Sequence, residues 1–286
     1  MIKPQKFTSR LASIEKVSSK VYVKRFDLIE PKEIAFLAGQ TVMLQVAPGV
    51  NRSMSIASPP SIHTSILVAH DVSPNGPYSQ WTVHASVGDS MNFIGPLGVF
   101  VCDAQSPRRK IFVATGTGIA PFRSMVLDQL SVLRSQKNLD PSSVSLPTNH
   151  SRYGNEKVKP DKIFSLPAPI ILYWGLRHEK DVFWEKEFED LATKHSNFQF
   201  VLTLSQPALT RRGRPSESWP ASNALRSNAG WQGKRGRVGE HVFAMEQNLM
   251  GSDFYLCGNK PMVTEMEAAL LAKGVPKEQI KRELFY

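Results

Sequence analysis

The first hundred residues alternate short apolar and β-branched runs with turn residues. Runs such as VYVKRFDLI, QTVMLQV, SILVAHDV and MNFI have the length and composition of strands. Only the stretch 78–87 favours a short helix, and Gly76 and Pro77 mark its start. Strands at this regular spacing predict a sandwich or a small barrel.

The pattern changes near residue 106, where we place a domain boundary between 1–106 and 107–286. KIFVAT at 110–115 is typical of a buried strand, and it leads into GTGIAP and an expected helix. Further on, the strand-like runs IILYWGL, FQFVLTLS and DFYLCG alternate with the helix-like runs DVFWEKEFEDLATKH, HVFAMEQNL and KPMVTEMEAALLAKG. This alternation predicts a parallel sheet covered by helices, hence an α/β second domain.

Two segments interrupt the second half. Residues 135–169 and 206–232 lack apolar periodicity and are longer than ordinary connections, so both are predicted to be flexible insertions. We expect no catalytic residue in either one, although the second could touch a ligand.

Composition narrows the possible chemistry. Hydrophobic residues make up 41% and charged residues 21% of 286 residues, as in ordinary globular proteins. The two cysteines, Cys102 and Cys257, cannot supply a four-ligand zinc or iron–sulfur site, so we predict no metal and expect an organic cofactor for any electron transfer. No run of about 18 to 20 apolar residues and no signal peptide are present, which favours a cytoplasmic protein without a membrane span.

The net charge of +10 is concentrated in the second half of the chain. Seven basic residues between positions 205 and 238 face one acidic residue, Glu217. Because no recognition motif accompanies this charge, we expect no nucleic-acid binding. The charge instead favours a solvated loop, or a binding site for phosphate or for an acidic protein.

The strongest local signal is the segment 113–121, VATGTGIAP. A strand ends in Gly116 and Gly118, which allow a tight turn that brings N–H groups and a helix N-terminus against a phosphate. The segment is neither a P-loop nor the full G-x-G-x-x-G fingerprint. On its own it equally indicates an ordinary glycine turn.

Six motifs occur in one order across both halves: RSMS at 52–55, GPYS at 76–79, GD at 88–89 followed by GPLG at 95–98, GTGIAP at 116–121, GLR at 175–177 and CGNKPM at 257–262. Together they resemble the ferredoxin–NADP reductase-like flavoenzymes over nearly the whole chain. The resemblance implies an antiparallel β-barrel that binds FAD, followed by a parallel-sheet nucleotide-binding α/β domain that binds NADPH or NADH.

The resemblance assigns the flavin to the first half. Arg52 would pair with the flavin pyrophosphate, because a guanidinium suits a diphosphate. Ser55 would lie near flavin N5, and Ser53 would contribute only its backbone groups. Met54 stands where the family usually has an aromatic residue that stacks on the flavin ring. Its thioether would contact the ring less rigidly. Gly76 and Ser79 resemble the pyrophosphate-binding element at a helix start. Without the resemblance, these residues indicate a barrel strand with an exposed arginine and a good turn.

The resemblance assigns the nicotinamide to the second half. The residues implied to line it are Gly116, Thr117, Gly118, Pro121, Cys257, Gly258 and Met262. Cys257 would shape hydride transfer without acting as a nucleophile, although a lone buried cysteine is often inert packing. Glu283 is implied in proton supply, and Tyr286 would lie against the flavin or its adenine.

Recognition of a 2′-phosphate would require cations. Arg177 matches a family arginine at the adenosine end, and Arg235 or Arg237 would be a second. Members selective for NADPH commonly carry Ser-Arg where this chain has Ser205 and Gln206, so the sequence favours NADPH over NADH only slightly. Arg211, Arg212 or Arg214 could replace the missing guanidinium.

The principal hypothesis is therefore an FAD-dependent NAD(P)H oxidoreductase that passes electrons to a one-electron carrier such as ferredoxin or flavodoxin, an acidic partner attracted by the basic surface. One alternative is the reductase component of an oxygenase or another multisubunit redox complex. A second is a flavin-free nucleotide-binding regulatory protein. Nucleic-acid binding through the basic loop is a third.

Overall fold

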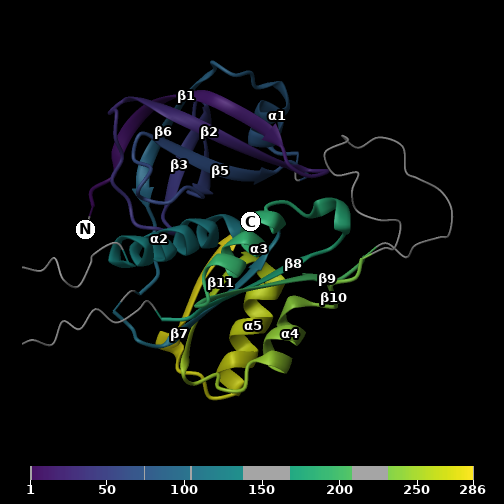
Figure 1. The fold of residues 1–286 in the computed structure, drawn as a ribbon. Helices are drawn as coiled ribbons and strands as arrows, with labels where there is room; N and C mark the ends of the chain where they lie inside the picture. Colours follow the sequence, from purple (N-terminus) through teal and green to yellow (C-terminus); the bar gives the residue numbers. More distant parts are fainter. Residues whose placement is uncertain (1, 74, 104, 138–167, 208–230, 286) are drawn as a thin grey trace, which may run out of the picture.

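The computed structural model describes residues 2–73, 75–103, 105–137, 168–207 and 231–285. The strands in these residues form two six-stranded sheets (Figure 1). The strands of one sheet precede residue 106 in the sequence, and those of the other follow it. The domain boundary that we place near residue 106 lies in the connection between the two sheets and stays a prediction.

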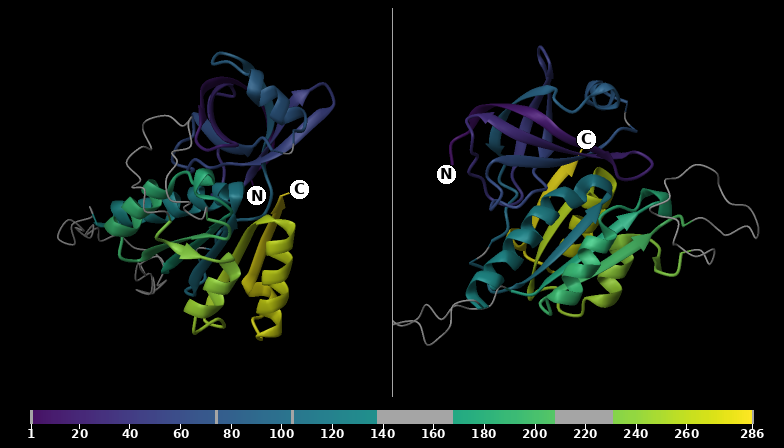
Figure 2. Two further views of the ribbon diagram at one scale, coloured as in Figure 1. Left: turned by 90° about the vertical axis from the view of Figure 1, so that its right-hand side faces the viewer. Right: turned by 45° about the horizontal axis from the view of Figure 1, so that its top comes forward.

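The first sheet is antiparallel and curls into an open barrel (Figure 2). Its strand order is β4-β3-β6-β1-β2-β5. The strands are β1 (Gln5–Lys16), β2 (Val21–Glu30), β3 (Thr41–Ala47), β4 (Val50–Ser55), β5 (Ser65–Asp71) and β6 (Ser90–Leu97). Alternate residues point inward, as in β1, where Phe7, Ser9 and Leu11 are buried. The short helix expected at 78–87 is α1 (Pro77–His84).

The second sheet is parallel throughout, with the strand order β10-β9-β8-β7-β11-β12. Its strands are β7 (Arg109–Thr115), β8 (Ile170–Leu176), β9 (Phe198–Leu204), β10 (Lys234–Arg235), β11 (Ser252–Asn259) and β12 (Ile280–Phe285). The predicted fold, an antiparallel barrel followed by a parallel-sheet α/β unit, is confirmed.

Helices cover both faces of the parallel sheet. The helices α2 (Ile119–Lys137) and α3 (Glu185–Lys194) pack on one face, and α4 (Val238–Met245) and α5 (Lys260–Ala272) pack on the other. Three short 3₁₀ turns, η1 (Gly116–Gly118), η3 (Glu179–Asp181) and η5 (Lys277–Gln279), complete the described elements. Successive residues of each strand therefore enter different cores, which explains why β8 is buried along its whole length.

The flexible insertions expected at 135–169 and 206–232 stay a prediction, and the structure describes only a few residues at their edges. Residues 135–137 are the last three residues of α2. Trp231 is buried, and its indole Nε1 donates to the Lys234 carbonyl oxygen over 2.9 Å. The remainder of both segments lies almost entirely outside the described residues.

The two units share one hydrophobic core. Val23, Ala57 and Phe100 of the first unit belong to the same buried cluster as Phe122 and Met125 of α2. Figure 1 shows α2 lying between the barrel and the parallel sheet. No helix in the described part of the chain combines the length and the apolar character that crossing a membrane requires.

Candidate functional site

The strand order of the parallel sheet reverses at β7. The chain moves outward from β7 through β8 and β9, then returns to β11 on the other side of β7. In open parallel sheets, ligands bind beyond the carboxyl ends of the strands at such a point. Thr115 ends β7, and Cys257 lies two residues before the end of β11; each is followed by glycine.

Two glycines let these strand ends approach each other. A Cβ on Gly118 would lie 2.7 Å from the Gly258 Cα and would overlap the Cys257 carbonyl oxygen. Gly258 has φ +142°, and a side chain there would overlap the Thr115 hydroxyl. By contrast, a Cβ on Gly116 would meet no atom within 4 Å, so the outer side of this turn is open to a ligand.

Three residues with predicted catalytic roles meet between the two units. Ser55 Oγ, at the end of β4, donates to Glu283 Oε2 of β12 over 3.0 Å. Cys257 Sγ, near the end of β11, lies 3.9 Å from the same oxygen and also donates to it. Figure 2 shows the end of β12 beside the barrel. The structure therefore brings Ser55, Cys257 and Glu283 into one cluster.

Burial controls protonation in this cluster. It raises the pKa of Glu283 to about 7, although the hydrogen bonds from Ser55 and Cys257 act in the opposite direction. Burial and the Glu283 carboxylate together raise the pKa of the Cys257 thiol well above its usual value. Glu283 can therefore gain or lose a proton near neutral pH, whereas Cys257 stays a thiol.

The two predicted pyrophosphate elements also lie together. Arg52 Nη2 lies 3.9 Å from the point that a Cβ on Gly76 would occupy. Gly76 caps the N-terminus of α1, no side chain caps that end, and Pro77 is at the first helical turn. Arg52 is exposed and its Nη1 donates to the Asn51 carbonyl oxygen over 2.8 Å. A guanidinium beside free helix N–H groups can hold a diphosphate.

Sequence reasoning missed three residues that anchor α1 to the barrel, His70, Lys24 and Thr82, and assigned Ser79 only to the pyrophosphate. Ser79 Oγ lies 3.1 Å from His70 Nε2 of β5, and Lys24 Nζ of β2 donates to Thr82 Oγ1 over 2.6 Å. The Lys24 ammonium also lies 4.2 Å from the centroid of the Tyr78 ring. A polar signal was present, because Lys24 interrupts the apolar run VYVKRF.

Burial has large effects on both of these basic side chains. Lys24 is fully buried, which lowers its pKa to about 7. The pKa of His70 falls to about 3, first through burial and then through the positive charges of Lys24 and Arg52. His70 is therefore neutral at physiological pH, and one of its ring nitrogens can accept a hydrogen bond.

The other predicted flavin residues lie on β4. Ser53 is exposed, and Met54 is partly buried against the barrel core. Among the predicted nicotinamide residues, Thr117 lies in the η1 turn, while Pro121 is buried in the first turn of α2. Met262 is buried in the core beneath α5, where its N–H donates to the helix-capping Asn259. Their contacts with cofactors stay predictions, and Tyr286 lies outside the described residues.

The predicted adenosine-end arginines follow the carboxyl ends of neighbouring strands. Arg177 comes directly after β8 and is exposed. Arg235 of β10 is paired with Leu204 of β9, and its Nη2 donates to the Trp231 carbonyl oxygen. Arg237 forms an exposed 3.4 Å ion pair with Glu265 of α5. Arg211, Arg212 and Arg214 lie outside the described residues.

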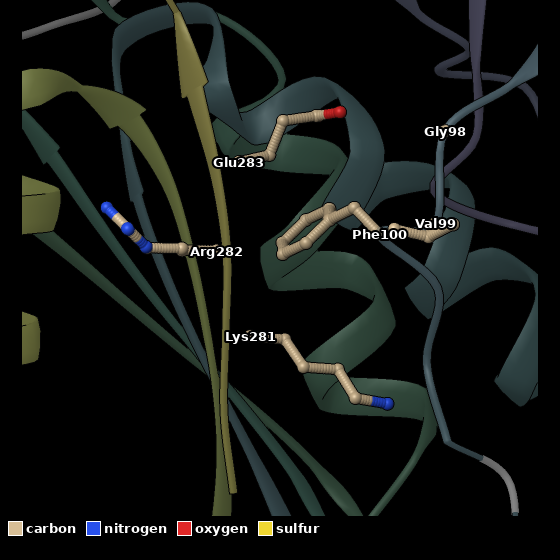
Figure 3. Close-up of a pocket in the computed structure, with 6 residues that line it drawn as sticks. All are labelled: Gly98, Val99, Phe100, Lys281, Arg282 and Glu283. Atoms are coloured by element: carbon tan, nitrogen blue, oxygen red, sulfur yellow. The ribbon is translucent and has the colours of Figure 1, made fainter. Parts of the chain in front are cut away.

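Glu283 also belongs to the lining of a pocket of about 450 Å³ (Figure 3). The pocket is lined by Gly98, Val99, Phe100, Lys281, Arg282 and Glu283. The Glu283 and Lys281 side chains extend to one side of β12 and that of Arg282 to the other. Val99 is 87% exposed, so the rim of the pocket is apolar as well as charged.

Comparison with known proteins decides the family. The oxidoreductase FAD-binding domain model matches residues 8–102, and the oxidoreductase NAD-binding domain model matches residues 112–268. The chain belongs to the ferredoxin–NADP reductase-like flavoenzyme family. It is an oxidoreductase that uses FAD and a nicotinamide nucleotide.

Individual relatives differ in the systems they serve. A ferredoxin–NADP reductase B of Sorangium cellulosum is 28% identical over 295 residues, with both chains fully covered. The xylene/toluene monooxygenase electron transfer component of Pseudomonas putida is 25% identical over 284 residues, which cover 98% of this chain and 65% of that relative. The ferredoxin reductase in carbazole 1,9a-dioxygenase matches the fold with a TM-score of 0.71 at 19% identity, covering 100% of this chain and 70% of that one.

The residues present fit both FAD and a nicotinamide nucleotide. The open turn at Gly116 and the close packing of Gly118 suit a dinucleotide at the strand ends, and Arg52 with the α1 N-terminus suits the flavin pyrophosphate. When bound, the flavin can accept a hydride and release electrons one at a time. The protein supplies orientation, and a carboxyl group at Glu283 that can exchange a proton.

Proposed function

We propose that this enzyme takes a hydride from NADPH or NADH and passes electrons singly to a separate carrier protein such as ferredoxin or flavodoxin. The observation that carries the proposal is the meeting of Ser55 with Cys257 and Glu283. It joins the end of the flavin strand to the switch point of the parallel sheet, the two places where the reacting rings would lie. The fully covered Sorangium relative, named as a ferredoxin–NADP reductase, supports the same reading.

The residues near the flavin have separate roles in this proposal. Ser55 donates a hydrogen bond beside flavin N5, and Cys257 fills the space against the nicotinamide with a small, neutral side chain. Glu283 holds a proton at Oε2 and can release it near pH 7. Arg52 and the α1 N-terminus hold the pyrophosphate, and Tyr286 covers the flavin or its adenine.

NADPH is the nucleotide that we favour, by a narrow margin. Arg177 follows β8, Arg235 is the last residue of β10 and Arg237 comes two residues later, so cations lie at the carboxyl ends of these strands. A 2′-phosphate would find its counter-charge there. Gln206 occupies the position after Ser205, where a further guanidinium would strengthen the preference.

The carrier would dock beside Glu283. Val99 is exposed there, Lys281 and Arg282 belong to the same pocket, and the whole chain carries a charge of +10. An acidic protein would be steered toward such a surface, and the apolar rim would contact it after encounter.

The experiment is a reduction assay with NADPH as donor and cytochrome c as final acceptor, with ferredoxin, flavodoxin or neither added. We expect a carrier to raise the rate at least tenfold and the gain to fall steeply as salt rises from about 50 to 300 mM. A direct reaction that no carrier accelerates would contradict the proposal. If a carrier raised the rate equally at low and high salt, that result would contradict only the electrostatic docking of the carrier and not the electron transfer to it.

A second candidate is the reductase component of an oxygenase, and the likeness to the Pseudomonas putida electron transfer component favours it. This chain spans 65% of that relative. The same assay separates the two once an oxygenase component is added as a third acceptor, because a dedicated oxygenase reductase would reduce that component faster than ferredoxin or flavodoxin.

A further inference from the structure

Arg123 joins three elements around the contact between the two units. The residue lies in the first turns of α2, five positions beyond Gly118. Its Nη1 donates to the Ala57 carbonyl oxygen over 2.8 Å. Its Nε and Nη2 donate to the two carboxylate oxygens of Glu187 on α3, over 2.8 and 2.7 Å. The guanidinium also lies 4.9 Å from the Trp184 ring centroid.

The residue beside it makes a parallel contact. Ser124 is fully buried, and its hydroxyl donates to the Ser58 carbonyl oxygen over 2.7 Å. Two successive residues of α2 therefore hold two successive carbonyls of the first unit. Those carbonyls belong to the segment that directly follows Ser55 at the end of β4.

The rest of the Arg123 contact is rigid. Glu187 holds the guanidinium through both oxygens, a geometry that fixes orientation as well as distance. The Arg123 side chain is only 16% exposed, so water competes weakly for these bonds. A lysine could make a single point contact here but could not satisfy Ala57 and both Glu187 oxygens in one plane.

We propose that Arg123, supported by Glu187, is a positioning residue that sets the distance and angle between flavin and nicotinamide. The inference rests on the proposed function, because it assumes that hydride passes between a nicotinamide at the turn 116–118 and a flavin beside Ser55. α2 begins directly after that turn, so the arginine ties the nicotinamide turn to the flavin strand through a few residues of helix. A shift of about 1 Å in such a geometry can cost about a hundredfold in rate.

Another contact between the units serves as a control. The Ser19 hydroxyl, between β1 and β2, donates to Asp181 Oδ1 over 2.9 Å, and Ser19 N donates to the Lys180 carbonyl oxygen. This contact also joins the units, but it involves neither β4 nor the turn 116–118. A second control is Lys186, whose side chain is 86% exposed on α3 and pairs only with Asp190 in the described residues.

The test uses the FAD-loaded full chain with Arg123→Met, Arg123→Lys and Glu187→Gln, beside the controls Ser19→Ala and Lys186→Met. Stopped-flow reduction by the preferred nucleotide, at several concentrations, separates the limiting rate of hydride transfer from nucleotide affinity. Reoxidation of dithionite-reduced flavin by ferricyanide reports on the flavin without any nicotinamide. Hydrogen–deuterium exchange of peptides covering residues 55–58 reports on the strand end directly.

We expect the limiting rate of both Arg123 variants to fall at least tenfold, with nucleotide affinity and ferricyanide reoxidation within twofold of the parent. The limiting rate of Glu187→Gln should fall less, and the limiting rates of both controls should match that of the parent. Exchange at 55–58 should rise in the Arg123 variants and not in the controls.

Three results would overturn the inference. One is a parent-like limiting rate accompanied by faster exchange, which would make Arg123 a stabilising contact only. Another is unchanged exchange at 55–58, and the third is an equal loss of hydride transfer and of ferricyanide reoxidation. Failure of the parent itself to be reduced by either nucleotide would instead overturn the proposed function, a result that the parent measurement reveals before any variant is compared. Should Arg123→Met fail to fold, Arg123→Lys carries the same comparison.

Discussion

At the scale of single residues, Glu283 is the group whose environment most constrains function. It accepts one hydrogen bond from Ser55 across the contact between the units and another from Cys257 on the neighbouring strand β11, and burial still keeps its pKa high. A carboxyl group in this state is half protonated near neutral pH. Its proton is therefore available at the pH where the enzyme would work.

The raised pKa of Glu283 predicts a change of stability with pH. The folded protein keeps this proton up to about pH 7, whereas the unfolded chain releases it near 4.5. Between those values the folded state binds more protons, so the free energy of unfolding falls as pH rises, by at most about 1 kcal/mol per pH unit. Glu283→Gln should remove this fall. Urea unfolding of both proteins from pH 5 to pH 8 measures it, and parallel curves would contradict the assignment.

Gly118 is the second residue whose chemistry is strongly constrained. In Gly118→Ala the new Cβ would overlap the Cys257 carbonyl oxygen, so the turn 116–118 must move away from β11. We expect reduction of the flavin by NAD(P)H to slow at least tenfold while FAD stays bound, because the flavin site lies on the other unit. Gly49→Ala, at a positive φ with open space around it, is the control for general loss of stability. Parent-like reduction of the Gly118 variant would contradict the placement of the nicotinamide.

The sequence identified Ser55, Cys257 and Glu283 only through the family resemblance. Ser55 and Glu283 are 228 positions apart, and no local pattern indicates that they touch. The glycines were different, because two glycines after a buried strand predict a tight turn by themselves. The pattern did not reveal why position 118 excludes a side chain, which is that β11 approaches it closely.

At the scale of elements, α1 is held on the barrel by polar groups in an apolar setting. Ser79 and Thr82 face inward from one side of the helix toward His70 and Lys24. Tyr78 lies between them, tilted against His70 and below the Lys24 ammonium. The orientation of the α1 N-terminus, where the pyrophosphate would bind, depends on these anchors.

Lys24 makes the anchoring of α1 dependent on pH. Burial lowers its pKa from 10.5 to about 7, so between these values the unfolded chain binds a proton that the folded chain lacks. The free energy of unfolding should therefore rise with pH from 7 to about 10, by at most about 1 kcal/mol per pH unit. Lys24→Met should lose this rise, and the exposed Lys186→Met should keep it. Urea midpoints at pH 7, 8 and 9 decide the matter, and a rise retained by Lys24→Met would contradict this assignment.

The elements themselves were largely predictable, and their irregularities were not. Alternation in the first half and the strand–helix order in the second gave the two sheets, because each sheet has a regular burial pattern. Lys24 escaped notice because a lysine within a strand is ordinarily assigned to the solvent side. In this barrel, its neighbours Val21 and Val23 pack toward the second unit, so the lysine points inward.

At the scale of the whole molecule, the contact between the units creates the site. The buried cluster around α2 includes residues of the barrel, and Arg123 and Ser124 fix the chain after β4. Sequence patterns describe each unit separately and contain no information on how two units pack. Arg123 was therefore missed, although it follows the GTGIAP motif closely.

We infer that this one chain brings FAD and a nicotinamide nucleotide into reacting distance. The most direct measurement is the visible spectrum of the purified protein, recorded without oxygen before and after addition of NADPH and then NADH. We predict flavin absorption bands that bleach, with NADPH acting at the lower concentration. Bands that persist after both nucleotides, or no bands even after incubation with FAD, would contradict the claim.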